Sequence, residues 1–286
     1  MELRRRYVSA KSGSNGNGKL MRTVLVSAVV SLCLCLSVSS PALANVNLAY
    51  QPMRVDLHLT PSQIQTGAIQ LKNEGATPMH LRARVLDFYV SANNTPQFAI
   101  QDDDVYSCRK WTMLNPTEVD IAPDAVTTFR YTMQVPAVLP SMSRTYRCAV
   151  AFESMPTLEE RLQKRASNQV RLVTVLYATI GNPTASPEIG DPQIQKSGKG
   201  WQLQMPFANS GETHYRLTGQ VLIKDSAGAT LQTLDMDSSP IHPQTSVRVE
   251  FPIEPLPNGE YTMQLQLKFG SKILLKDAVV SVEASK

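Results

Sequence analysis

Alternating apolar and polar residues dominate the chain beyond about residue 50, and helical periodicity is nearly absent there. Short runs of this kind are separated by Pro, Gly, Asn and Asp, which is typical of β-strands joined by turns. The predicted strands of the first half span residues 55–59, 67–71, 80–86, 127–135, 146–152 and 169–180. Those of the second half span residues 201–205, 217–223, 229–234, 246–251, 261–269 and 272–282.

The strand pattern is interrupted once, by small residues and two prolines in residues 181–187. Prolines cannot donate to a sheet, so this stretch predicts a linker between two domains. The fold class is therefore all-β, with two tandem immunoglobulin-like sandwiches in residues 45–183 and 184–286. Residues 225–228 predict a hairpin turn, and Thr157 followed by Glu160 predicts a short capped helix between two strands.

The N-terminal segment has the features of a secretory signal peptide. After Met21 and Arg22 comes an apolar run, residues 23–38, which is followed by small residues up to Ala44. We expect cleavage after Ala44, so that residues 1–44 are a signal peptide with an N-terminal extension. Residues 1–20 suggest either a long targeting extension or a true start at Met21 rather than Met1, and we favour the second.

The rest of the chain carries no sign of a membrane anchor. The apolar run is about 16 residues, shorter than the roughly 20 of a spanning helix, and no second run follows. Cys33 and Cys35 are each preceded by a leucine, where a lipoprotein signal would have a small residue. We therefore expect a soluble, periplasmic mature protein without stable membrane insertion.

Charge gives no support to nucleic-acid binding. The segment up to Ala44 contains six of the 28 basic residues and one of the 24 acidic residues. The remaining 242 residues thus hold 22 basic and 23 acidic side chains, so the net charge is close to zero. The basic character of the full sequence belongs to the segment that we expect to be removed.

Cys108 and Cys148 are the two cysteines outside the leader. An even pair in an exported chain favours a disulfide, because the compartment is oxidising. The alternative is a pair of buried free thiols, since cysteine is often buried in any case.

Motifs for catalysis or for metal binding are not evident in the sequence. The four histidines lack metal-ligand spacing, and the chain has no nucleophile elbow and no phosphate-binding glycine loop. His58 alternates with leucines, which indicates a solvent-facing strand position. Residues 102–104 are three consecutive aspartates, and we interpret them as a solvated acidic turn rather than a calcium site. We expect no enzyme activity, no cofactor and no metal.

Five segments of the chain resemble the PapD-like periplasmic chaperones of pilus and fimbrial assembly. They are Arg54 in the first strand, residues 69–75 with Asn73, residues 111–124, residues 146–156, and the strand from Val170 to Pro183. In the second half, residues 207–211 are similar to the family's strand end with an Asn and a Gly. The resemblance covers most of residues 50–286.

The resemblance implies a chaperone that caps pilus or fimbrial subunits by donor-strand complementation. In that mode a strand of the chaperone completes the unfinished sandwich of a subunit, main chain pairing with main chain. The residues expected to bind the subunit are Val170, Leu172, Thr174, Leu176 and Ala178. Their strand is apolar on both faces, which is also what a buried central strand shows.

Arg54 is the residue that, by the resemblance, would hold the C-terminal carboxylate of a subunit. The family places a second basic residue shortly before the closing proline, but this chain has residues 178–182 without any Lys or Arg. The implied partners are secreted subunits and an outer-membrane usher, and self-capping as a homodimer is also allowed. The alternative is a secreted or envelope structural protein with adhesive immunoglobulin-like domains and no chaperone activity.

Overall fold

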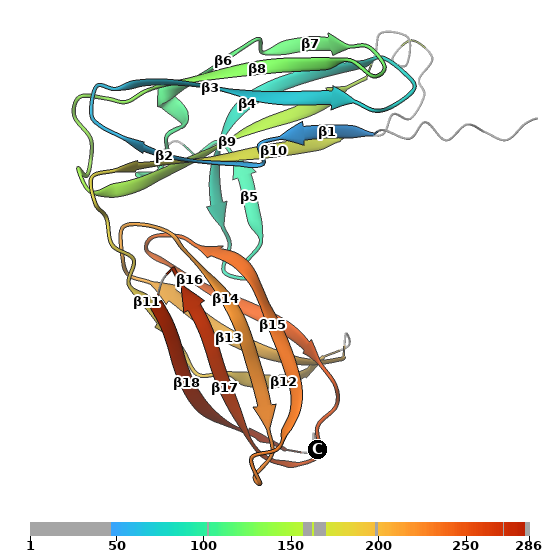
Figure 1. Ribbon diagram of the computed structural model, residues 1–286, viewed down its shortest axis with the longest axis vertical. Coiled ribbons are helices and arrows are strands. Elements are labelled where there is room, and N and C mark those ends of the chain that lie inside the picture. Colours follow the sequence, from blue (N-terminus) through green and yellow to red (C-terminus); the bar gives the residue numbers. More distant parts are fainter. Residues whose placement is uncertain are drawn as a thin grey trace, which may run out of the picture. The chain divides into compact units, whose positions relative to one another are not determined.

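The computed structural model describes residues 47–101, 103–156, 162, 170–197, 200–270 and 272–283. Over these residues the chain forms four β-sheets, two in each of two sandwiches (Figure 1). This confirms the all-β, two-sandwich prediction. The described part of the chain contains no helix with the length and hydrophobicity needed to cross a bilayer. The predicted signal peptide, with its cleavage after Ala44, and the capping box at Thr157 lie outside the described residues.

The first sandwich is built from β1 to β10. One sheet has the order β1-β3-β8-β6, and the other has the order β2-β10-β9-β4-β5 with β7 paired to β4. The first sheet contains β1 (Leu48–Gln51), β3 (Ile64–Asn73), β8 (Val126–Gln134) and β6 (Thr112–Asn115). The second contains β2 (Arg54–Leu59), β10 (Arg171–Ile180), β9 (Arg144–Met155), β4 (Met79–Val90), β5 (Pro96–Ala99) and β7 (Glu118–Ile121).

Alternating burial places the core of this sandwich between its two sheets. Ile69 on β3 and Phe129 on β8 are fully buried on one side, and Phe152 on β9 is fully buried on the other. The rings of Phe129 and Phe152 meet edge-on with centroids 4.9 Å apart. Aromatic contacts of this kind add to the free energy gained from apolar burial, so this pair joins the two sheets.

Strand β4 continues past Leu86, the last of its residues that pairs with β9. From Asp87 to Val90 it pairs with β5, forming a hairpin over residues 87–99 that we call the β4–β5 arm (Figure 1). Phe88 stacks on Phe98 across this hairpin with a centroid distance of 5.1 Å. Phe88 and Val90 belong to the same apolar cluster as the core of the second sandwich. The arm therefore connects the apolar packing of the two sandwiches.

The second sandwich is built from β11 to β18. One sheet has β13 at its centre, between β16 on one side and β11 and β12 on the other, and the second sheet has the order β15-β14-β17-β18. The first contains β11 (Pro187–Ile189), β12 (Gln193–Ser197), β13 (Gly200–Asn209) and β16 (Thr245–Ile253). The second contains β14 (Tyr215–Lys224), β15 (Thr230–Ile241), β17 (Gly259–Phe269) and β18 (Lys272–Val282). The predicted turn between β14 and β15 is confirmed, because Gly228 N donates to Asp225 O at 3.0 Å.

Both sandwiches contain the same buried asparagine turn. The side-chain amide of Asn73 donates to Thr77 O and Ile121 O, and its oxygen accepts from Gly75 N. Asn209 makes the corresponding bonds with Thr213 O, Ile241 O and Gly211 N. Each asparagine thus satisfies at least three main-chain groups at a strand end, and Asn209 also accepts from Ser186 N. These bonds explain the Asn-x-Gly pattern in the sequence.

Gly219 on β14 cannot be replaced without disturbing the second sandwich. Its φ is 142°, and a Cβ there would lie 2.1 Å from Gln266 O on β17. We expect Gly219→Ala to lower the free energy of unfolding by about 1–3 kcal/mol from backbone strain alone, and further through the clash. Gly228→Ala is the matched control, because Gly228 has φ 83° and nothing within 4 Å of a Cβ. Urea unfolding that gave equal losses for the two variants would contradict the role of the clash.

Candidate functional site

Strand β10, the predicted donor strand, is paired unequally on its two sides. It pairs with β9 in antiparallel fashion along its whole length, from Arg171 to Ile180. On the other side it pairs in parallel with β2, but only from Val175 onward. No strand in the described part of the chain pairs with residues 171–174 on that side. The strand is therefore interior in its second half and an edge in its first half.

The open edge of β10 begins close to Val173. Val175 N donates to Met53 O at 3.0 Å, so the main-chain groups of the odd-numbered residues point toward the β2 side. Val173 O on that side accepts a hydrogen bond of 3.1 Å from the hydroxyl of Tyr50. The edge that an added strand would meet therefore runs from Val173 toward Arg171.

The predicted subunit-binding side chains occupy two different environments. Leu176, Ala178 and Thr174 are fully buried, and the first two belong to the core of the first sandwich. Val170 is half-buried, and Leu172 is half-buried against the same core. The even-numbered face of β10 is therefore the interior face of the sandwich, and only the part near the open edge remains accessible.

Arg54 lies at the start of β2, opposite Val175 of β10. Its side chain is 44% exposed, and Nε pairs with the carboxylate of Asp56 at 2.7 Å. Asp56 also lies 4.0 Å from Nε2 of His214, which belongs to the segment before β14. Arg54 is thus placed next to the contact between the two sandwiches.

Further cations lie at this contact, on strands that no feature of the sequence predicts to be neighbours. Tyr177 on β10 is buried, and burial raises its pKa, while Arg216, Arg147 and Arg54 each lower it through their charge. These arginines come from β14, β9 and β2, so three strands bring positive charge to one tyrosine. In the sequence, Arg147 is distinguished only as the one charged residue within the apolar run of residues 146–152.

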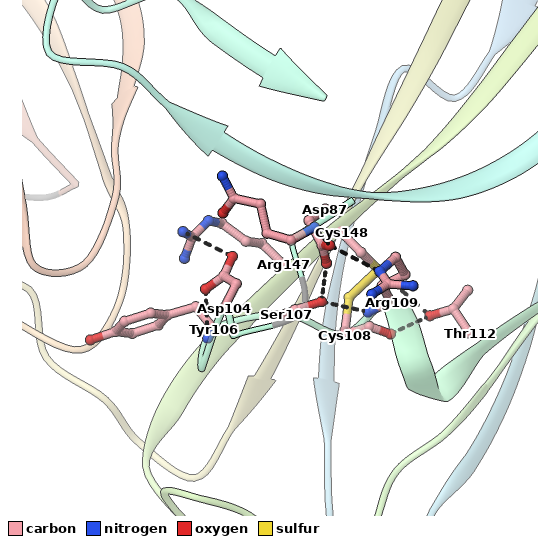
Figure 2. A network of polar contacts seen from close by, with 10 residues as sticks. Asp87, Asp104, Tyr106, Ser107, Cys108, Arg109, Thr112, Arg147 and Cys148 are labelled. Carbon is pink, nitrogen blue, oxygen red and sulfur yellow. Dashed lines mark hydrogen bonds and ion pairs between the residues drawn. A yellow bond between two sulfur atoms is a disulfide. The ribbon is translucent and has the colours of Figure 1, made fainter. Parts of the chain in front are cut away.

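The carboxylate of Asp87, at the base of the β4–β5 arm, organises a buried polar network (Figure 2). Asp87 is fully buried and accepts hydrogen bonds from Gln101 N at 2.6 Å, from Nε of Arg109 at 2.9 Å and from the hydroxyl of Ser107. A buried carboxylate needs such compensation, because the loss of hydration is otherwise unopposed. The network fixes Gln101, Ser107 and Arg109 against β4.

The disulfide attaches the same segment to β9. Cys108 and Cys148 are bonded, with Cα atoms 5.3 Å apart, which confirms the predicted pair (Figure 2). Cys108 N donates to Arg147 O at 3.0 Å, and Arg147 N donates to Tyr106 O at 2.7 Å. Residues 106–108 therefore pair with β9 at Arg147, close to Ala149, where the pairing of β9 with β4 ends.

The acidic turn is not fully solvated, so that part of the sequence interpretation is wrong. The carboxylate of Asp104 is 8% exposed and lies 3.5 Å from Nη2 of Arg147, whereas Asp103 is exposed. The guanidinium of Arg147 also donates to Phe88 O at 2.6 Å, and burial lowers its pKa. Asp104 is drawn inward because a buried cation requires a counter-charge. No three His, Cys, Asp or Glu side chains among the described residues gather where they could hold a metal ion.

Polar contacts join the sandwiches on either side of Tyr177. Thr145 N donates to Glu212 O at 2.9 Å, and the carboxylate of Glu212 pairs with Arg144. At the arm, Arg248 N donates to Ala92 O at 2.8 Å. These main-chain bonds connect β9 and the arm to the second sandwich.

No family model matches the sequence, and no curated protein matches it. Many solved structures are similar to it, among them fimbrial chaperones. The similarity to these structures is one of fold, at low sequence identity. The class 5 fimbriae chaperone CfaA is 12% identical, with 81% of this chain and 99% of that chain covered and a TM-score of 0.45. The YadV chaperone is also 12% identical, with 81% and 98% covered and a TM-score of 0.46.

A further similar structure is the CsuC–CsuE chaperone–tip adhesion subunit pre-assembly complex of the archaic chaperone-usher Csu pili of Acinetobacter baumannii. It matches at 14% identity, with 82% of this chain and 98% of that chain covered and a TM-score of 0.44.

Proposed function

We propose that this chain is a non-enzymatic periplasmic chaperone that holds pilus- or fimbrial-type subunits by strand pairing. The observation that carries the proposal is the open edge of β10 at residues 171–174, next to the half-buried Val170 and Leu172. An unpaired strand edge offers main-chain donors and acceptors to an incoming strand, and adjacent apolar side chains make the pairing selective. A subunit that lacks one strand is a partner of matching chemistry.

The proposal limits the donor surface to the first half of β10. Leu176 and Ala178 stay in the core of the first sandwich, because removing them would open a cavity there. Val170, Leu172 and the main chain of residues 171–174 would cover the groove of the subunit. The same edge would allow two copies of the chain to cap each other in the absence of a subunit.

Arg54 is proposed to bind the C-terminal carboxylate of the subunit. Guanidinium groups suit this role because two parallel N–H donors fit one carboxylate. The side chain is partly exposed, and its Nε is engaged by Asp56 on the same strand. A carboxylate arriving there would also lie in the positive field of the arginines around Tyr177.

Capture of a partner tests the proposal directly. The full chain would be expressed with a C-terminal tag in a bacterial periplasm, together with secreted proteins encoded beside it, and purified under native conditions. We expect a one-to-one complex with a small secreted protein that aggregates without this chain, and a mature N-terminus at Asn45 by mass spectrometry. An outer-membrane usher is the expected recipient. A monomer or homodimer without a partner would favour the envelope structural protein instead.

Four variants, two tests and two matched controls, locate the interaction within that assay. We expect Leu172→Asp to abolish capture, because a carboxylate cannot enter an apolar groove without a large loss of hydration. Val126→Asp is the matched control, since Val126 is 60% exposed on β8. We expect Arg54→Ala to reduce capture at least tenfold and Arg130→Ala, an exposed arginine on β8, to leave it unchanged. Thermal denaturation of each variant separates lost binding from lost folding, and unchanged capture by a folded Leu172→Asp variant would exclude the proposed edge.

A further inference from the structure

Two histidines contact Tyr177 where the sandwiches meet: His242 is fully buried, and the side chain of His214 is 16% exposed. The imidazole of His214 stacks on the Tyr177 ring at a centroid distance of 4.0 Å and an angle of 20°. The imidazole of His242 is fully buried, and its Nε2 lies 3.0 Å from the hydroxyl of Tyr177. Phe88 of the β4–β5 arm meets the His242 ring edge-on at 4.7 Å. Both imidazoles are therefore enclosed by residues of the two sandwiches.

The surroundings of both rings oppose a positive charge. Nδ1 of His214 and Nδ1 of His242 are buried and have no hydrogen-bond partner among the described residues. The cations facing His214 are Arg216, Arg54 and Arg147, and the one anion is Asp56 at 4.0 Å. His242 faces Arg147, Arg216 and His214, together with the neutral hydroxyl of Tyr177. The carboxylates of Asp104 and Asp87 lie near Arg147 and offset part of its charge.

We propose that the contact between the two sandwiches is an acid-sensitive joint, closed while His214 and His242 are neutral and opened when they take up protons. This inference goes beyond the proposed function and does not depend on it. Opening would return both imidazolium groups to water and separate them from Arg54 and Arg147 of the first sandwich. Each sandwich would keep the apolar residues between its own two sheets, whereas Phe88, Val90 and Tyr177 of the first sandwich would lose their contacts with the core of the second.

The direction of the pH effect follows from the shifts of the two histidines. Burial, more than any other cause, lowers the pKa of His214 from 6.5 to about 4 and lowers that of His242 well below 6.5. Above pH 6.5 both histidines are neutral in the closed and in the open state, so the contact is fully stable. Between pH 6.5 and about 4 the open state binds more protons, so each pH unit favours opening by up to about tenfold per histidine. For His214 alone the change over that range is roughly 300-fold.

Amide hydrogen exchange measures this opening locally. Thr145 N and Arg248 N donate across the contact, to Glu212 O and Ala92 O. Val221 and Leu265 are paired within the second sandwich and serve as the internal reference. In the full chain we expect protection factors, corrected for intrinsic exchange, to fall at least 100-fold between pH 7 and pH 4.5 at the first two amides. The reference amides should retain their protection.

Replacement of the histidines supplies the comparison. The double variant His214→Phe and His242→Gln keeps the ring stacking on Tyr177 and a polar partner for its hydroxyl, but cannot take up protons. We expect its protection at Thr145 and Arg248 to be independent of pH, and we expect His58→Gln, an exposed position on β2, to behave as the wild type. Equal pH dependence in the wild type and the double variant would overturn the proposal. If the double variant fails to fold, NMR titration of the wild-type imidazoles decides, because titration of both near pH 6.5 in the folded chain would also overturn it.

Discussion

Removing the disulfide by Cys108→Ala together with Cys148→Ala should lower the free energy of unfolding by about 3–4 kcal/mol. The bond joins residues separated by 40 positions, and its loss restores the chain entropy of that loop in the unfolded state. Both sulfur atoms are also fully buried, so the loss of packing adds to the effect. Urea unfolding can be monitored by the fluorescence of Trp111, which contacts Tyr146 on β9 and therefore reports on the first sandwich.

Reduction of the wild-type protein in denaturant, followed by refolding with the thiols blocked from reoxidising, is the matched control. Reduction breaks the covalent bond but leaves both sulfur atoms in place. It therefore separates the effect of the cross-link from the effect of the lost side-chain volume. We expect most of the loss to be reproduced by reduction alone. A difference below 1 kcal/mol between oxidised and reduced protein would show that the segment around Cys108 is held mainly by its polar contacts.

Asp87→Ala should be about as damaging, with an expected loss of about 3–5 kcal/mol. The substitution removes the carboxylate that accepts hydrogen bonds from Nε of Arg109, from the hydroxyl of Ser107 and from the main-chain N–H of Gln101. Breaking one side of a buried ion pair costs more than the pair contributes, because the remaining charge stays buried. The arm from residue 87 to residue 99 begins at this carboxylate, so its contacts with the second sandwich should loosen as well.

Two comparisons isolate the charge of Asp87. Asp87→Asn keeps the shape and one acceptor, so we expect a smaller loss than with alanine. Asp120→Ala removes an exposed carboxylate that pairs with His80 in the same sandwich, and surface pairs contribute about 1 kcal/mol or less. Denaturant titrations of the three variants should therefore rank Asp87→Ala first and Asp120→Ala last. Equal effects of the alanine variants would mean that the network around Asp87 adds nothing beyond a surface pair.

The acid-sensitive joint and the strand-pairing function make separate demands on the contact between the sandwiches. Opening at low pH would move Arg54 away from Arg216 on β14 but would leave the open edge of β10 intact. Strand pairing could then persist in acid while carboxylate binding weakened. The two effects are distinguishable in the same capture assay, performed at pH 7 and at pH 5 with the Arg54→Ala variant as the reference.

The long strands were determined by the sequence alone. Residues 272–282 alternate strongly, and β18 has those bounds. The strands predicted at residues 261–269 and 80–86 are present with longer ends. Their alternation records burial of one face, which is a local property of each segment. The pair Cys108 and Cys148 was likewise evident, because only two cysteines remain after the leader.

Short strands and inward-turned charges were decided by the tertiary structure. The strands β5 and β7 have four residues each and owe their conformation to pairing with β4, so their sequences carry too little periodicity to be found. Asp104 is one of three consecutive aspartates, a pattern that predicts an exposed turn. Its carboxylate is nevertheless turned inward, because it pairs with the buried Arg147. Strand β10 is apolar on both faces because one face meets its own core and the other meets the second sandwich. Which half of that strand is open depends on where β2 begins, opposite Val175, and no property of residues 170–180 themselves contains that information.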